Sequence, residues 1–137
     1  MAKDIFHKLV RSALEKDGWT ITADPLRLEY EEEKFEPDLA AEKILVAEKG
    51  ATKIAVEIKS FIGQTFRQDF YEALGQFLHY HFVLSKVEPD RKLLLAVPHT
   101  AYNTNFQKAY VLEMVEQYKI PMLVYHTKND ELIQWIN

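Results

Sequence analysis

The chain of 137 residues contains no cysteine, so it can form neither a disulfide framework nor a zinc site built on thiolates. It also lacks any apolar run near the roughly 20 residues that span a bilayer. Its first residues, MAKDIFHKLV, do not resemble a signal peptide. We therefore expect a soluble cytoplasmic protein with no membrane partner. The chain has only four glycines, and they form no phosphate-cradling loop, so a P-loop nucleotide site is not expected.

The chain also has no excess of basic residues. Its 21 aspartates and glutamates outnumber its 17 lysines and arginines and give a net charge of -4. A protein that binds DNA alone usually has a basic face that gains affinity by counterion release. Six acids lie between residues 29 and 38, where a solvated loop, a metal-attracting rim and a surface for a basic partner are alternative interpretations. Any contact with nucleic acid is therefore expected to be local, weak or assisted by another protein.

The residues that are present suit one ordinary hydrophobic core, since 47% of them are hydrophobic, and we expect a single domain over residues 1–137. Apolar residues at helical spacing predict helices at 3–16, 65–86 and 105–118. Extended apolar segments predict strands at 19–23, 26–30, 38–48, 53–60, 92–97, 121–126 and 131–136. The order of these elements predicts an α/β (α+β) fold with a mixed sheet flanked by helices, and a hairpin that turns at 49–52.

The segment KIAVEIK at residues 53–59 carries two charged residues on one face of its strand. Side chains alternate along a strand, so the isoleucines and the valine share one face, and Glu57 and Lys59 point together to the other. Burying a carboxylate without a partner in such an apolar strand is costly. An exposed ion pair between Glu57 and Lys59 is the alternative interpretation.

A second acid would complete a site for a divalent cation. Asp38 and Glu57 can hold a hard cation through oxygen, and Lys59 can orient a water or stabilise charge on a phosphate. Counting back from the hairpin turn places Ile44 opposite Glu57 and Glu42 opposite Lys59, with Asp38 several residues further on. A β-bulge or a strong twist of the strand would bring Asp38 close to Glu57. We favour Asp38 and retain Glu42 as a ligand or supporting group.

The long helix after this strand carries Gln76 and Tyr80, which are four residues apart and therefore share one helix face. In a functional site, Gln76 would hold a ligand carboxylate or a phosphate, and Tyr80 would stack on a base or sugar. The alternative is that both simply pack, the tyrosine with a satisfied hydroxyl. The five histidines show no metal-binding spacing and no serine lies in a nucleophile elbow, so neither a zinc enzyme nor a serine hydrolase is expected.

The combination of Pro37-Asp38, Glu57-Ile-Lys59 and Gln76-x-x-x-Tyr80 resembles the PD-(D/E)xK nuclease superfamily. Along its whole length the chain also resembles the XisH family, the cyanobacterial fdxN element excision controlling factors. The segments that carry this likeness are AKDIFH (2–7), DGWTIT-DPLRL (17–28), DLAAEK (38–43), KIAVEIKSF (53–61), ALGQF (73–77), LAVP (95–98), LVY (123–125) and IQWIN (133–137).

This resemblance implies a restriction-endonuclease-like core in which Asp38, Glu57 and the backbone carbonyl of Ile58 would bind Mg2+ or Mn2+. Lys59 would be the catalytic lysine, with Glu42, Gln76 and Tyr80 in support. It further implies a control factor for excision of a DNA element during heterocyst differentiation. The expected partners are DNA, a XisI-like companion protein and a site-specific recombinase. A non-catalytic adaptor that binds the companion or the recombinase is the alternative function, and the oligomeric state is left open.

Overall fold

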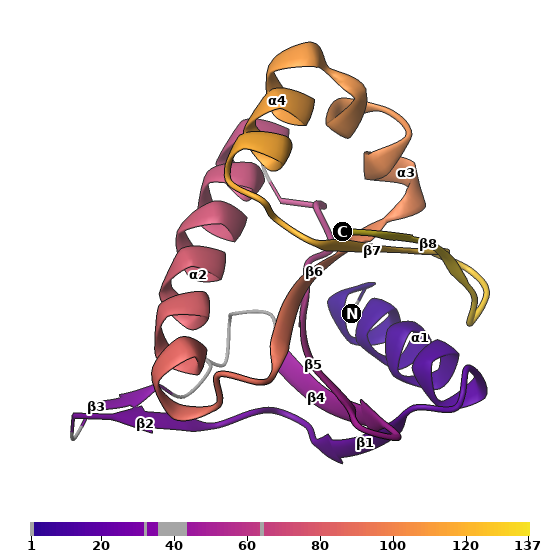
Figure 1. Ribbon diagram of the computed structural model, residues 1–137. Coiled ribbons are helices and arrows are strands. Elements are labelled where there is room, and N and C mark those ends of the chain that lie inside the picture. The colour runs from indigo at the N-terminus through magenta and orange to yellow at the C-terminus, as the bar shows by residue number, and fades with distance from the viewer. Residues whose placement is uncertain (1, 32, 36–43, 64) are drawn as a thin grey trace.

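The computed structural model describes residues 2–31, 33–35, 44–63 and 65–137 (Figure 1). The helical elements are α1 (Ala2–Lys16), α2 (Phe66–Val87), α3 (His99–Tyr102), the 3-10 turn η1 (Asn105–Gln107) and α4 (Ala109–Gln117). The strands are β1 (Thr20–Ala23), β2 (Leu28–Tyr30), β3 (Glu33–Phe35), β4 (Ile44–Lys49), β5 (Thr52–Ile58), β6 (Lys92–Pro98), β7 (Met122–Tyr125) and β8 (Leu132–Ile136). In this part of the chain no helix is both long and apolar enough to cross a bilayer.

Six strands form one mixed sheet in the order β1-β4-β5-β6-β7-β8. The pairs β5–β6 and β6–β7 are parallel, and the other neighbouring pairs are antiparallel. The strands β2 and β3 form a separate antiparallel ribbon. Helix α1 covers one face of the sheet and α2 the other (Figure 1). The predicted mixed sheet flanked by helices is confirmed.

Each face of the sheet has its own apolar core. On the α1 side, Val10 and Leu14 pack against Ile54 and Val56, all of them at most 3% exposed. On the α2 side, the helix buries a stripe that includes Phe70 and Phe77, together with side chains from α3, η1 and α4. Burial of a side chain of this size contributes about 1.5 to 3 kcal/mol. The strands β5 and β6 are central because both of their faces are covered.

The β4–β5 hairpin has the register that the sequence predicts. Lys49 pairs with Thr52 across the turn, and Ile44 lies opposite Glu57. The helix that follows begins after Thr65, whose side-chain oxygen accepts a hydrogen bond from the backbone N–H of Gln68 at 3.1 Å. The predicted strand at 38–48 is confirmed from residue 44 onward, and its earlier part lies outside the described residues.

One prediction about secondary structure is wrong, and two short elements were not predicted. The helix predicted at 105–118 is divided into η1 and α4, because Lys108 between them is extended with φ -64° and ψ 137°. The short helix α3 was not predicted from the sequence, and neither was β3, which lies in the acidic segment. The remaining helices and strands lie within a few residues of their predicted positions.

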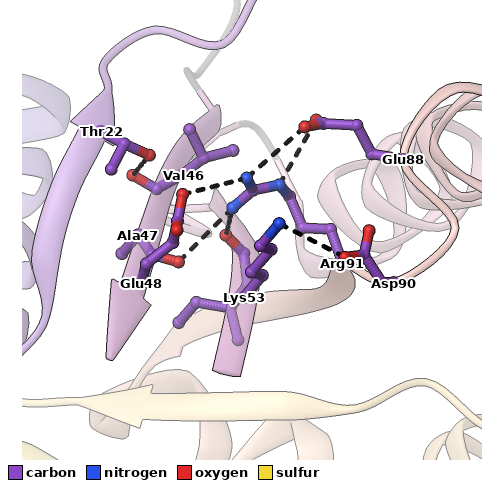
Figure 2. Close-up of polar contacts among 9 residues, drawn as sticks. Thr22, Val46, Ala47, Glu48, Lys53, Glu88, Asp90 and Arg91 are labelled. Carbon is purple, nitrogen blue, oxygen red and sulfur yellow. Dashed lines mark hydrogen bonds and ion pairs between the residues drawn. The ribbon is translucent and has the colours of Figure 1, made fainter. Parts of the chain in front are cut away.

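Arg91, just before β6, joins four elements near the hairpin turn, at the start of β5 (Figure 2). Its guanidinium donates to the backbone carbonyl of Ile54 at 3.0 Å and approaches that of Ala47 at 3.5 Å. The same group is paired with Glu48 at 3.4 Å and with Glu88 at 3.3 Å. Glu88 is the residue that caps the C-terminal end of α2. Arg91 therefore fixes the hairpin and the end of α2 against the start of β6.

Candidate functional site

Glu57 and Lys59 are both buried at the carboxyl end of β5. Glu57 lies between Ile44 on β4 and Leu95 on β6, and only 1% of it is exposed. Lys59 follows the last residue of the strand and is 6% exposed. Both belong to the face that α2 covers, since the neighbouring Ala55 packs in the α2-side core. The interpretation as an exposed surface pair is therefore wrong, and the prediction that the two charges share a face is confirmed.

Helix α2 brings Gln76 and Tyr80 to these charges. The ammonium of Lys59 donates a hydrogen bond to Oε1 of Gln76. Burial raises the pKa of the Tyr80 hydroxyl, and the negative charge of Glu57 raises that pKa further. Gln76 and Tyr80 thus face the strand, as predicted, and one carboxylate, one ammonium, one amide and one phenol meet between β5 and α2. The amide oxygen of Gln76 thus orients the ammonium of Lys59. That Gln76 would also hold a ligand carboxylate or a phosphate stays a prediction.

The backbone of Lys59 is held independently of its side chain. Its N–H donates to the carbonyl of Ala96 on β6 at 3.0 Å, and its carbonyl accepts a hydrogen bond from the hydroxyl of Tyr125 at 2.8 Å. Tyr125 is fully buried at the end of β7 and comes from the α1 side of the sheet. Sequence reasoning did not connect Tyr125 with this site. The available signal was a tyrosine at the end of a buried strand, whose hydroxyl needs a partner.

Phe61, two residues after Lys59, has a left-handed backbone with φ 54°. This conformation is unfavourable for a bulky residue and persists only where surrounding contacts impose it. The Phe61 ring stacks on Phe66 at 5.7 Å and meets Phe106 edge-on at 5.2 Å, between ring centroids. These contacts fix the chain as it leaves β5, and with it the direction of the Lys59 backbone.

The two candidate second acids, Asp38 and Glu42, lie outside the described residues. The choice of Asp38 over Glu42 as the second metal-binding acid beside Glu57 therefore stays a prediction. Among the described residues, no three histidine or acidic side chains are grouped so that they could hold a metal ion. The donors that are described, the Glu57 carboxylate and the carbonyl of Ile58, are oxygens of the kind that hard divalent cations prefer. They fit Mg2+ or Mn2+ once one further carboxylate is supplied.

The Tyr80 hydroxyl is expected to stay protonated at pH values where an exposed tyrosine ionises, about pH 10. Because folding raises this pKa, the contribution to stability is complete below the ordinary value and is lost as pH rises through the folded pKa. Absorbance at the phenolate band, recorded for the wild type and for Tyr80→Phe, isolates this group. In Glu57→Gln its titration should move to lower pH. Tyr118→Phe, at an exposed position just after α4, serves as the control.

Comparison with known proteins identifies relatives of this chain. The family model described as XisH protein matches residues 1–133. A crystal structure of a fdxN element excision controlling factor protein from Anabaena variabilis is 44% identical, with a TM-score of 0.90 over 98% of this chain and 99% of that one. A crystal structure of a XisH family protein from Nostoc punctiforme is 41% identical, with a TM-score of 0.90 over 98% of this chain and 100% of that one.

No match is found among curated proteins. The family model nevertheless covers nearly the whole chain, and the two crystal structures agree with it in both sequence and fold. The chain belongs to the XisH family.

Proposed function

We propose that this protein is a control factor for the excision of a DNA element, as the name of its Anabaena variabilis relative indicates, and that it acts on DNA through metal-dependent phosphodiester cleavage. The observation that carries the cleavage proposal is the group in which the buried Glu57 and Lys59 meet the half-buried Gln76 and Tyr80. Charged side chains are almost never buried unless they are paired or functional. The same proposal includes the family role in heterocyst differentiation and the PD-(D/E)xK type of site.

Each residue of the group has a separate task in this proposal. Lys59 donates to the attacking water or to a phosphate oxygen, where negative charge develops. Gln76 keeps the ammonium of Lys59 in place through its Oε1. Tyr80 stays a neutral hydroxyl because burial and Glu57 both oppose its ionisation, so it can donate to the substrate. Glu57, the carbonyl of Ile58 and either Asp38 or Glu42 would hold Mg2+ or Mn2+.

If bound, such a cation would polarise the phosphodiester and favour deprotonation of the attacking water. The surroundings of Glu57 favour this use of its carboxylate. Ile44 and Leu95 flank it on the neighbouring strands and exclude bulk water, which strengthens electrostatic interactions in the site. The site lies at the edge where the parallel strands β5 and β6 end, which is a common place for ligands in open sheets.

The test measures metal binding and cleavage separately. Calorimetric titration with Mn2+ should show binding to the wild type and none to Glu57→Gln. Branched and nicked DNA duplexes incubated with Mn2+ should be cut by the wild type and not by Glu57→Gln. The control is Lys53→Met, which alters the same strand and the same face at its far end. Cutting by Glu57→Gln at the wild-type rate would exclude this site as the source of activity.

A non-catalytic adaptor is the second candidate function, favoured by the net charge of -4 and by exposed aromatic side chains. Tyr110 and Tyr118 on or next to α4 and Trp135 on β8 are all exposed, although Phe106 and Tyr125 belong to the core. Exposed aromatic residues are enriched in protein interfaces. In this case a XisI-like companion or the recombinase should co-purify with the protein in the absence of DNA, and calorimetry should detect no Mn2+ binding.

A further inference from the structure

The outer face of α2 carries large apolar side chains that the described chain leaves exposed. Tyr71, Leu78 and Phe82 are 57, 58 and 52% exposed. With Gly75 they follow each other at intervals of four, three and four residues, so they lie on one side of the helix, opposite Gln76 and Tyr80. This spacing is that of the contact positions in a pair of coiled helices. We refer to Tyr71, Gly75, Leu78 and Phe82 as the α2 seam.

Gly75 is the unusual member of the α2 seam. It lies in the middle of a 22-residue helix, where glycine is less favourable than any residue except proline. A Cβ atom added at this position would meet no other atom within 4 Å. Nothing in the described chain therefore requires glycine here. The missing side chain leaves a hollow between Tyr71 and Leu78 that suits the side chain of an approaching helix.

We propose that the α2 seam is the interface of a homodimer, in which α2 packs antiparallel against α2 of a second copy. With the twofold axis between residues 76 and 77, Leu78 of each protomer enters the hollow at Gly75 of its partner. Tyr71 of each protomer then packs against Phe82 of its partner. The pairing is isologous, and it covers all four seam positions of both copies. Phe82 is already held in place by an edge-on contact with Tyr30 at 5.8 Å between ring centroids.

The charges beside the α2 seam favour the antiparallel direction and a second copy of this chain. Glu72 flanks the first half of the seam, and His79 and Lys86 flank the second half on the same side. In an antiparallel pair, equivalent flanks of the two helices lie next to each other. Glu72 of one protomer therefore lies on the same flank as the ammonium of its partner's Lys86, and the two helix dipoles oppose each other. The interface is complementary to itself in both shape and charge.

Sedimentation equilibrium without DNA or metal tests the dimer. Because the contact is small, we expect a dissociation constant in the micromolar range for the wild type, measured between about 1 and 100 μM protein. Leu78→Glu should raise this constant about 30-fold or more. Tyr110→Glu changes an aromatic residue of similar exposure on α4 and should leave it unchanged.

Gly75→Leu separates an interface role from a folding role. Leucine has high helix propensity and open space around it in one protomer, so the midpoint of thermal unfolding should rise by about 3 °C at concentrations where the protein is monomeric. The same side chain fills the hollow that Leu78 of the partner needs, so the dimer should weaken. A more stable protein with a weaker dimer is the expected result.

Because the chain has no cysteine, cross-linking of introduced cysteines can determine whether the two α2 helices pair antiparallel. Residues 71 and 82 of different protomers adjoin each other, whereas two copies of residue 71 lie about 16 Å apart along the helices. A mixture of Tyr71→Cys and Phe82→Cys proteins should therefore form a disulfide-linked heterodimer, and Tyr71→Cys alone should not.

A wild type that is monomeric throughout the concentration range would overturn the proposal, as would a dimer that both Leu78→Glu and Gly75→Leu leave intact. Either result leaves the proposed action on DNA untouched.

Discussion

Replacing Lys59 by methionine is expected to slow Mn2+-dependent DNA cleavage by about 100- to 1,000-fold, the usual cost of removing one donor that stabilises transition-state charge. Lys59 is 6% exposed and its ammonium is directed by Oε1 of Gln76, so it is positioned before substrate arrives. A donor held in this way needs little reorganisation during the reaction, and burial strengthens its effect.

Methionine is chosen because it retains the length and apolar stem of lysine while removing the charge. The backbone hydrogen bonds of residue 59 to Ala96 and from Tyr125 do not depend on its side chain, so the local fold should persist. Mn2+ affinity, which the proposal assigns to Glu57 and its oxygen neighbours, should change far less than the rate. The loss is therefore expected in kcat and in single-turnover rates.

The matched control is Lys53→Met, which makes the same chemical change on the same face of β5 at its exposed end. It should cleave DNA at the wild-type rate. If Lys59→Met and Lys53→Met retain the same activity, Lys59 does not participate in the reaction. If both lose activity together, the effect follows from net charge and DNA affinity instead, and its dependence on salt concentration should show this.

The parts of the site that depend on strand alternation and helix spacing could be predicted from the sequence. Both are local regularities, and once the turn at 49–52 is recognised they determine that Ile44 lies opposite Glu57. The spacing of Gln76 and Tyr80 likewise places both on the face of α2 that meets β5. What could not be predicted is how these elements are held together, because those contacts join residues that are far apart in sequence.

The helix predicted at 105–118 shows where periodicity misled the prediction. Its aromatic residues repeat as in one helix, but Phe106 is completely buried in the aromatic group around Phe61 and Phe66. To reach that position the chain forms the short turn η1, and Lys108 becomes extended before α4 begins. Tertiary packing therefore overrides local helix preference, and nothing in the sequence alone indicates where the interruption falls.

Arg91 is the clearest case of a residue whose importance only the structure shows. In the sequence it is one charge in an ordinary loop between a helix and a strand. In the structure its side chain is 6% exposed, and its partners Ala47 and Ile54 are 44 and 37 residues away. These two carbonyls belong to residues that pair with each other across β4 and β5. The guanidinium therefore ties the hairpin to β6, and through Glu88 it also ties the end of α2 (Figure 2).

Arg91→Met is expected to lower the free energy of unfolding by about 3 kcal/mol, at the lower end of the cost of breaking a buried ion pair, because Glu48 and Glu88 remain partly exposed. The substitution removes the donor to two backbone carbonyls and the cation that the carboxylates of Glu48 and Glu88 share. Urea denaturation measures the change, and the midpoint of thermal unfolding should fall by about 10 °C.

Arg91→Lys should fall between the wild type and Arg91→Met, because lysine keeps the charge but cannot contact the carbonyls and both carboxylates with one planar group. Lys53→Met breaks a neighbouring ion pair with Asp90, at 3.4 Å, that is exposed on both sides. It should leave the unfolding free energy nearly unchanged, because exposed pairs contribute little. Equal stability of Arg91→Met and Lys53→Met would show that the Arg91 contacts do not hold the sheet to α2. A selective loss in Arg91→Met would instead identify this residue as the support that keeps β5 and α2, and therefore Glu57 and Gln76, in register.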